Sequence, residues 1–169
     1  MANANDILQQ ASKKYGTRLY WHIRRLVVSH DDAEDALQET FIKIFTKASQ
    51  FKGGDDALQG WCYKIATNEA LQLLRKRTRV FQSLDSIGPE LADTLATEAA
   101  PGADKSAILF QQAILRLSTQ QRVVFTLRYY DDLSYAQIAS ITGKSENSLR
   151  TNYHYAVENI KEYLKENAI

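Results

Sequence analysis

Apolar residues along this chain recur at intervals of three and four positions, and strict alternation of apolar and polar residues is scarce. Intervals of three and four place side chains on one face of an α-helix. In the first half of the sequence this pattern predicts helices over residues 6–14, 18–28, 32–47 and 56–77. Glycine and proline, which interrupt helices, number only 7 and 2. The sequence therefore predicts an all-α protein.

The apolar positions of these helices define a predicted core for the first half of the chain. Acids crowd the first turn of the helix 32–47, where they favour the positive end of the helix dipole. Cys62, a lone cysteine on an apolar helix, is expected to be a small core residue. The other predicted core positions are Leu19, Ile23, Leu26, Val27, Ala33, Ala36, Leu37, Phe41, Ile44, Phe45, Trp61, Ile65, Leu71 and Leu74.

The composition changes between residues 80 and 104. This stretch holds five acids, both prolines and no Lys or Arg, which is typical of a solvated tether. We therefore expect two small helical domains, residues 1–79 and 105–169, joined by a flexible acidic linker at 80–104.

The second domain contains the pattern of a helix-turn-helix in LSYAQIASITGKSENSLRTNYHYAVENIK, residues 133–161. Ser134 and Gln137 have the spacing of a capping box, which starts a helix. Gly143 can adopt the left-handed conformation that ends a helix, and Ser145 can cap the next one. The inward stripe of the second helix is expected to be Leu149, Tyr153, Ala156 and Ile160. An αα-hairpin within a bundle is the alternative interpretation.

The second helix of this motif would place its N-terminal half in the major groove of DNA. The outward residues that can donate to phosphates or base edges are Asn147, Arg150, Thr151 and His154. Arg150 is the only basic residue of this helix before Lys161, so the electrostatic contribution to binding is small. We therefore expect this helix to bind DNA weakly on its own.

The overall charge is nearly balanced, with 21 Lys and Arg against 20 Asp and Glu. Any nucleic-acid binding must therefore rest on local clusters of charge. One cluster is RKRTR, which contains Arg75, Lys76, Arg77 and Arg79. A solvated helix end with dipole-favourable cations is one interpretation, but this density of bases favours contact with DNA.

Other classes of protein find no support in the sequence. With one cysteine there is no internal disulfide, and the 3 histidines show no ligand spacing. No nucleophile–base pair, P-loop or carboxylate dyad stands out, so we expect no metal, no cofactor and no catalytic activity. The N-terminus lacks the features of a signal peptide, and no apolar run reaches the length of a membrane span. These features predict a cytoplasmic protein with no membrane insertion of its own.

The chain resembles the small, two-domain extracytoplasmic-function (ECF) group of bacterial sigma factors, within the sigma-70 family. The resemblance lies in three segments in order: DAEDALQETF, FKGGDDALQGWCYKIATNEALQLLRKR and LSTQQRVVFTLRYYDDLSYAQIASITGKSENSLRTNYHYAVENI. It implies a subunit that binds core RNA polymerase, directs promoter-specific initiation at −35 and −10 elements, and melts the −10 DNA. It also implies an anti-sigma factor as a partner.

In the family, the helix matching DAEDALQETF docks on the clamp helices of the polymerase β′ subunit, and the β flap is a further implied contact. The matching residues here are Asp35, Gln38 and Glu39, whose spacings of three and four allow one shared surface. Residues 31–39 hold five acids and no base, which suits an Arg-rich partner. A solvated acidic face that only caps a helix is the alternative interpretation.

In the family, the segment matching FKGGDDALQGWCYKIATNEALQLLRKR opens the −10 element and holds the non-template strand. Flipped bases need a pocket, polar edges and a cationic track. The matching residues are Lys52, Gly54, Asp55, Asp56, Gln59, Lys64, Asn68, Arg75, Lys76, Arg77 and Arg79. For Trp61, core packing is favoured over stacking on a base.

The chain departs from many family members at four positions. Thr67 stands where Arg is common, and Gln72 stands where an acid is common. Asn152 and Tyr155 stand where the recognition helix usually carries further bases. These departures bear on which −35 and −10 sequences are read.

Two other functions remain open at this point. One is a stand-alone helix-turn-helix regulator, which would bind a palindromic site as a dimer. The other is a sigma mimic that sequesters an anti-sigma protein and never touches DNA. The sparse charge of the recognition helix favours the mimic, while the RKRTR cluster argues against it.

Overall fold

The computed structural model describes residues 3–77, 88, 91–92, 95 and 101–168. Their elements are α1 (Ala4–Val27), α2 (His30–Thr46), the 3-10 turn η1 (Ala48–Gln50), α3 (Asp55–Arg77), α5 (Lys105–Leu115), α6 (Thr119–Tyr129), α7 (Tyr135–Thr142) and α8 (Glu146–Asn167). Because helices make up this part of the chain without any strand, the predicted all-α fold is confirmed. Among these helices, none is long and apolar enough to cross a bilayer.

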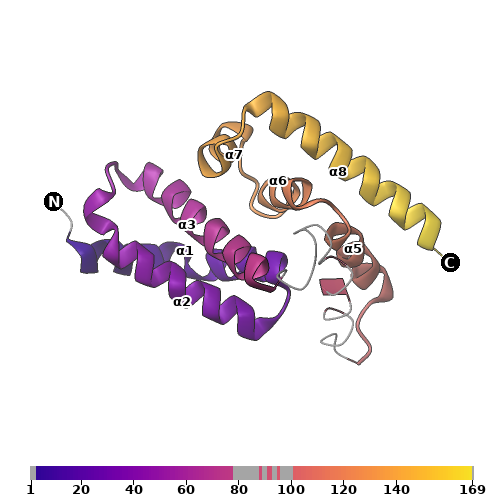
Figure 1. Cartoon of the computed structure of the whole chain (residues 1–169), viewed down its shortest axis with the longest axis horizontal. Helices are drawn as coiled ribbons and strands as arrows, with labels where there is room; N and C mark the ends of the chain where they lie inside the picture. Colours follow the sequence, from indigo (N-terminus) through magenta and orange to yellow (C-terminus); the bar gives the residue numbers. More distant parts are fainter. Residues whose placement is uncertain (1–2, 78–87, 89–90, 93–94, 96–100, 169) are drawn as a thin grey trace.

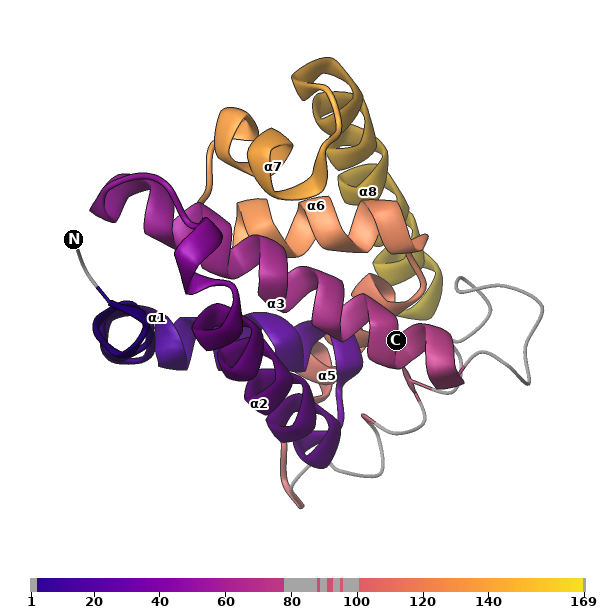
Figure 2. The same ribbon diagram turned by 60° about the vertical axis from the view of Figure 1, so that its left-hand side comes forward.

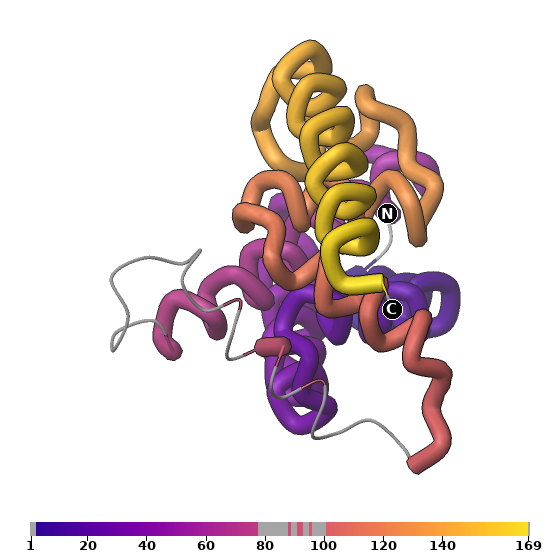
Figure 3. Tube along the Cα trace, turned by 90° about the vertical axis from the view of Figure 1, so that its right-hand side faces the viewer, coloured from indigo at the N-terminus to yellow at the C-terminus, as the bar shows by residue number. Residues whose placement is uncertain are grey.

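The helices form two groups that lie against each other. Helices α1, α2 and α3 pack together at one end, and α5 to α8 pack together at the other (Figure 1). Helix α7 packs against α3, and α6 packs against α1 as well as α8, so the turned view shows α6 and α7 beside α3 (Figure 2). Helix α8 is the outer helix of its group and lies toward the viewer in Figure 3. We call the two groups the N-terminal half and the C-terminal half.

Helix α1 is one continuous helix, so the prediction of two helices over 6–14 and 18–28 was wrong. The break was placed around Gly16, which lies inside the helix. One glycine in a helix costs only about 1 kcal/mol relative to alanine, and one unbroken apolar stripe outweighs that cost. The buried apolar members of the stripe are Ile7, Ala11, Leu19, Ile23, Leu26 and Val27.

Helix α2 buries a narrower stripe than the sequence predicted. Its fully buried positions are Ala33, Ala36, Thr40 and Ile44. Leu37 and Phe41 are half-buried, and the prediction that Phe45 faces inward was wrong because its side chain is 44% exposed. Small residues on the buried side let α2 approach α1 and α3 closely. Successive helical positions lie about 100° apart, so Phe45, which follows buried Ile44, turns outward.

Helix α3 packs against both α1 and α2 of the N-terminal half. Its buried side chains include Cys62, as expected, together with Leu58, Ile65, Ala66, Ala70 and Leu74. Trp61 is half-buried and packs against Phe51, with ring centroids 4.9 Å apart. Its partner is therefore a protein ring, in agreement with the packing role expected for it.

The caps of the helix-turn-helix are as predicted. The Ser134 hydroxyl accepts from the Gln137 N–H at 3.1 Å, and the Gln137 side chain accepts from the Ser134 N–H at 2.8 Å. Gly143 has a φ of +75°, and the Ser145 hydroxyl caps α8 by accepting from the Ser148 N–H at 3.1 Å. Of the predicted inward stripe, Leu149, Ala156 and Ile160 are buried and Tyr153 is half-buried.

The stretch predicted to be a linker is described only in part. Leu91 and Ala92 are buried within the same hydrophobic core as α1 and α3. Residues 101–104 are exposed, and Asp104 caps α5 through the Ser106 N–H at 3.0 Å. Two residues of the predicted linker, Leu91 and Ala92, are therefore packed into the core. The boundaries of the two domains remain a prediction.

Candidate nucleic-acid interface

The acidic face of α2 presents the predicted docking residues together. Asp35, Gln38 and Glu39 are all exposed, on the side of α2 away from its buried stripe. Ile42 and Phe45 follow Gln38 at four and seven residues, which keeps them on the same face, and they are 53% and 44% exposed. This face therefore combines an acidic part with two exposed apolar side chains.

The loop before α3 forms the rim of a pocket of about 500 Å³. Three predicted −10 residues, Lys52, Gly54 and Asp55, line it beside apolar residues that form its walls. Those apolar residues are Ile7, Ala48, Phe51 and Leu58. Asp55 also pairs with Lys14 across 3.4 Å. A pocket with apolar walls and a polar rim has the chemistry needed to hold an unstacked base.

The other predicted −10 residues are spread along α3, which is about 34 Å long at 1.5 Å per residue. Asp56, Lys64, Asn68, Arg75, Lys76 and Arg77 are exposed. Gln59 is half-buried, 3.1 Å from the Arg18 guanidinium. Arg77 forms an ion pair with Asp32 of α2, and Arg79 lies outside the described residues. The structure thus distributes the predicted set over a track along α3 and does not gather it at a single point.

On α8, all four predicted −35 residues are exposed: Asn147, Arg150, Thr151 and His154. The Arg150 guanidinium lies 3.5 Å from both Glu146 and Asn147. Its centre is 5.0 Å from the ring centroid of Tyr135 on α7. The turn between the helices adds a second exposed cation, Lys144.

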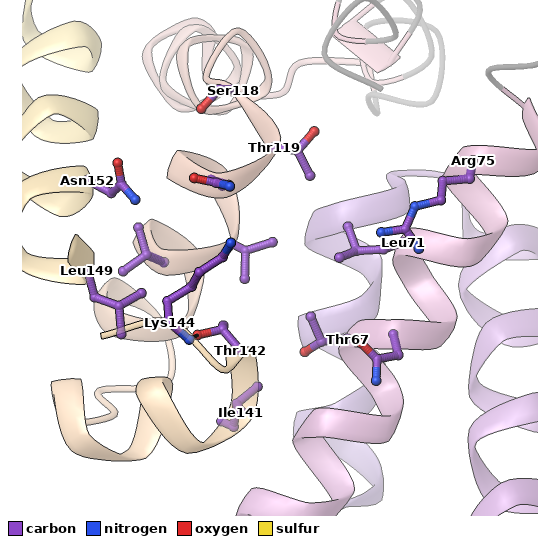
Figure 4. Close-up of a pocket in the computed structure, with 14 residues that line it drawn as sticks. Thr67, Leu71, Arg75, Ser118, Thr119, Ile141, Thr142, Lys144, Leu149 and Asn152 are labelled. Carbon is purple, nitrogen blue, oxygen red and sulfur yellow. Dashed lines mark hydrogen bonds between the residues drawn. The ribbon is translucent and has the colours of Figure 1, made fainter. Parts of the chain in front are cut away.

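A groove of about 560 Å³ separates α3 from the helix-turn-helix (Figure 4). Asn68, Leu71 and Arg75 line it from α3, and Lys144 and Asn152 line it from the other side. Its floor is apolar, with Val123, Val124, Ile141 and Leu149. Predicted −10 residues and the recognition helix therefore face one another in this arrangement.

A buried polar cluster around Asp131 joins the two halves. Asp131 follows α6, and its side chain is 5% exposed. Tyr63 of α3 donates its hydroxyl proton to Asp131 Oδ1 at 2.8 Å. His22 Nδ1 and an Arg25 guanidinium nitrogen, both on α1, lie 3.9 Å from Asp131 Oδ2. Arg25 also stacks on Tyr130, 4.2 Å from its ring centroid.

Burial sets the protonation of this cluster. It lowers the pKa of His22 to about 3, with a smaller contribution from Arg25. It raises the pKa of Asp131, while the hydrogen bond from Tyr63 and the charges of Arg25 and Arg18 act in the opposite direction. Burial and the Asp131 carboxylate also raise the pKa of Tyr63. His22 is therefore neutral at pH 7, which suits its 2.8 Å hydrogen bond with Thr67 Oγ1.

Sequence reasoning missed this cluster, and the local signal explains why. Asp131 and Asp132 sit together in a turn, where acids are usually solvated, and the pattern alone does not distinguish the buried one from the exposed one. Thr67, noted only as a departure from the family, is buried and bonded to His22. Tyr135 was missed because its cationic neighbours, Arg128 and Arg150, come from two other helices.

Known protein families match both halves of the chain. The model of sigma-70 region 2 matches residues 12–80, and that of sigma-70 region 4 matches residues 107–160. The RNA polymerase sigma-H factor of Pseudomonas aeruginosa is 30% identical over 161 residues, covering 90% of this chain and 83% of that protein. The ECF sigma factor SigW of Bacillus subtilis is 26% identical over 161 residues, covering 90% and 86%. The chain spans 59% of the ECF sigma factor SigE of Mycolicibacterium smegmatis, at 27% identity over 90% of this chain.

Solved structures share the fold. The sigma factor RpoE of Bartonella quintana, solved with the anti-sigma factor NepR, superposes with a TM-score of 0.72 at 24% identity, covering 94% of this chain and 97% of that one. CnrH, solved with the cytosolic domain of CnrY, gives a TM-score of 0.69 at 18% identity, covering 95% and 89%. With region 2 and region 4 in order along one helical chain, the protein belongs to the sigma-70 family of RNA polymerase sigma factors, in its ECF group.

Proposed function

We propose that this protein binds core RNA polymerase and directs initiation at promoters with particular −35 and −10 elements. The observation that carries the proposal is the presence of regions 2 and 4 in order on one chain. Each region presents an exposed surface of suitable chemistry: the acidic face of α2 and the outward residues of α8. The polymerase supplies the chemistry of RNA synthesis, and the protein acts in the cytoplasm where polymerase works.

For the N-terminal half, Asp35, Gln38 and Glu39 are proposed to dock on the polymerase clamp. Exposed carboxylates at helical spacing suit a basic partner because they can accept bidentate hydrogen bonds from arginine. Ile42 and Phe45 extend this face with apolar area, which contributes more to affinity than exposed charge does.

For promoter opening, the loop pocket beside Lys52 and Asp55 is proposed to hold a flipped −10 base. The exposed cations of α3 would bind the phosphates of the same DNA strand beyond the flipped base, since a cationic track is the usual way to hold a single strand. The −35 element would be contacted by Asn147, Arg150, Thr151 and His154. Two weak contacts on one chain reinforce each other once polymerase holds both.

An anti-sigma factor is proposed as a second partner. RpoE and CnrH, which share the fold, were each solved in complex with a second protein, NepR and the cytosolic domain of CnrY. In this chain the groove between α3 and the helix-turn-helix has an apolar floor and two rim cations, Arg75 and Lys144. Such a groove would accept an amphipathic helix with acidic flanks.

The docking proposal is tested by reversing two charges of α2. We expect Asp35→Arg with Glu39→Arg to abolish co-purification with core polymerase and protein-dependent run-off transcription, because it places cations opposite a basic partner. The matched control is Glu162→Arg with Glu166→Arg, which makes the same change at the same spacing on exposed positions of α8. Unchanged thermal unfolding would show that both variants are folded. Retention of polymerase by the α2 variant, or equal loss in the control, would contradict the assignment.

The sigma mimic remains the second candidate because one feature favours it. Arg150 is the only base of the recognition helix before Lys161, so little counterion release accompanies DNA binding. Run-off transcription with core polymerase and a promoter library separates the two functions. A protein-dependent transcript supports the initiation factor, and its absence from every promoter, without inhibitor, supports the mimic.

A further inference from the structure

Tyr135, the first residue of α7, lies close to two guanidinium groups. Arg128 of α6 and Arg150 of α8 have their guanidinium carbons 4.6 Å and 5.0 Å from its ring centroid. Both distances are within the range of a cation–π interaction, in which the negative face of the ring attracts a cation. One ring therefore connects cations from the two helices that flank α7.

The Tyr135 ring is itself held in place. The capping box of Ser134 fixes the start of α7. The ring makes an edge contact with Tyr153 of α8, with centroids 6.3 Å apart and an interplanar angle of 75°. Tyr153 stacks on buried Phe125 with centroids 5.7 Å apart. A chain of aromatic contacts thus joins Tyr135 to the core of the C-terminal half.

Arg150 needs such support because its own helix holds it weakly. Its side chain is 54% exposed, and its contacts with Glu146 and Asn147 are both long, at 3.5 Å. A solvated arginine samples many rotamers, and ordering it on DNA has an entropic cost. Contact with a fixed ring restricts these rotamers before DNA arrives.

We propose that Tyr135 is a positioning residue that holds the Arg150 guanidinium ready for the −35 DNA. This inference rests on the proposed function and adds to it a residue that faces no base itself. The same ring holds Arg128, whose guanidinium also donates to the Leu133 carbonyl at 3.0 Å. Arg128 is half-buried, and it therefore holds the ring from the side of α6.

The test compares promoters with intact and substituted −35 elements, using the full-length protein with core polymerase. The measured quantity is −35 discrimination, the ratio of run-off transcript from the two promoters. We expect Tyr135→Phe to keep this ratio, since the ring remains, and Tyr135→Leu to lower it about two- to five-fold. In the Arg150→Ala background, Tyr135→Leu should cause no further loss, because the residue it positions is gone.

The control is Tyr129→Leu, which removes an exposed tyrosine ring that stacks on Phe125 in the same half of the molecule. It should leave −35 discrimination unchanged. Equal loss in this control, additive losses in the double variant, or full discrimination in Tyr135→Leu would each overturn the positioning role. If Arg150→Ala alone leaves discrimination unchanged, the −35 assignment of Arg150 fails instead.

A second measurement needs no destabilising variant. Protons above an aromatic ring resonate upfield, so the Arg150 side-chain protons of the wild-type protein should be shifted upfield in an NMR spectrum. Tyr135→Phe should preserve that shift. Arg150 protons at the position of a solvated arginine would overturn the proposal.

Discussion

His22 shows how the surroundings of one residue determine its chemistry. Its imidazole is fully buried between α1, α3 and the turn after α6. Nε2 pairs with the Thr67 hydroxyl at 2.8 Å, and Nδ1 lies 3.9 Å from a carboxylate oxygen of Asp131. Burial lowers its pKa to about 3 in the folded protein, whereas the ordinary value is 6.5. The folded state therefore binds fewer protons than the unfolded chain between these two values.

This difference predicts a loss of stability in mild acid. The contribution of neutral His22 is complete above pH 6.5 and declines as the pH falls toward 3, because the unfolded chain takes up the proton first. The raised pKa of Asp131 has the opposite effect, because the folded state then holds a proton on this carboxyl at pH values above its ordinary pKa of 3.8. We expect the free energy of unfolding in urea to fall between pH 7.5 and 5.5, and to fall less in His22→Gln. Equal slopes in the two proteins would contradict this assignment.

At the scale of elements, the loop between η1 and α3 offers a comparison between adjacent glycines. Gly53 has a φ of +147°, and a Cβ on it would lie 2.7 Å from the Ala57 Cβ. A Cβ on Gly54 meets no described atom within 4 Å. Only the first glycine is therefore required by the conformation of the loop that forms the proposed base pocket.

We expect Gly53→Ala to destabilise the protein by about 1–3 kcal/mol, the usual cost of a strained backbone position. It should also reduce promoter opening, because the rim of the loop pocket must shift. Gly54→Ala is the matched control for stability alone and should unfold within about 0.5 kcal/mol of the wild type. The measurements are urea denaturation and permanganate reactivity of −10 thymines in the complex with polymerase. Similar stability for the two variants would show that the loop tolerates a Cβ at residue 53.

The sequence predicted those features of each helix that depend only on neighbouring residues in the chain. Capping residues such as Ser134, Gln137 and Ser145 act within one turn, so their roles were visible in the pattern. Gly16 misled the prediction because tertiary packing along α1 outweighs the weak local preference against glycine. Phe45 misled it because only the packing of α2 against two neighbours decides which side of a wide apolar stripe is buried. Asp131 depends on partners far away in sequence, and Tyr135 depends on partners from two other helices, so the sequence without its fold does not reveal either role.

The whole molecule is held in its packed arrangement by the contacts between its halves, including those of Asp131. Replacing Asp131 by Ala removes the acceptor of the Tyr63 hydroxyl, and an unsatisfied buried donor costs about 1–3 kcal/mol. We expect Asp131→Ala to loosen the two halves, seen as a larger radius of gyration in small-angle X-ray scattering and faster amide exchange in α6 and α7.

The neighbouring acid provides the control for this prediction. Asp132 is exposed and has a φ of +54°, a conformation that asparagine tolerates well. Asp132→Asn should therefore keep the compact arrangement. An unchanged radius and exchange pattern in Asp131→Ala would show that the apolar contacts of α3 with α7 are sufficient without the carboxylate.

The groove shared by α3 and the helix-turn-helix has a consequence for promoter affinity. This one groove is lined by Asn68, a proposed −10 contact, and by Asn152 of α8, the helix proposed to contact the −35 element. Elements centred near −10 and −35, by contrast, lie more than two turns of DNA apart, on the order of 70–80 Å. Binding to both elements therefore selects an open conformer, and the apparent affinity falls in proportion to the fraction of molecules that are open. Every 1.4 kcal/mol or so of contact between the halves lowers that fraction about ten-fold. Substitutions around Asp131 are thus expected to change promoter occupancy at a distance from every residue that touches DNA.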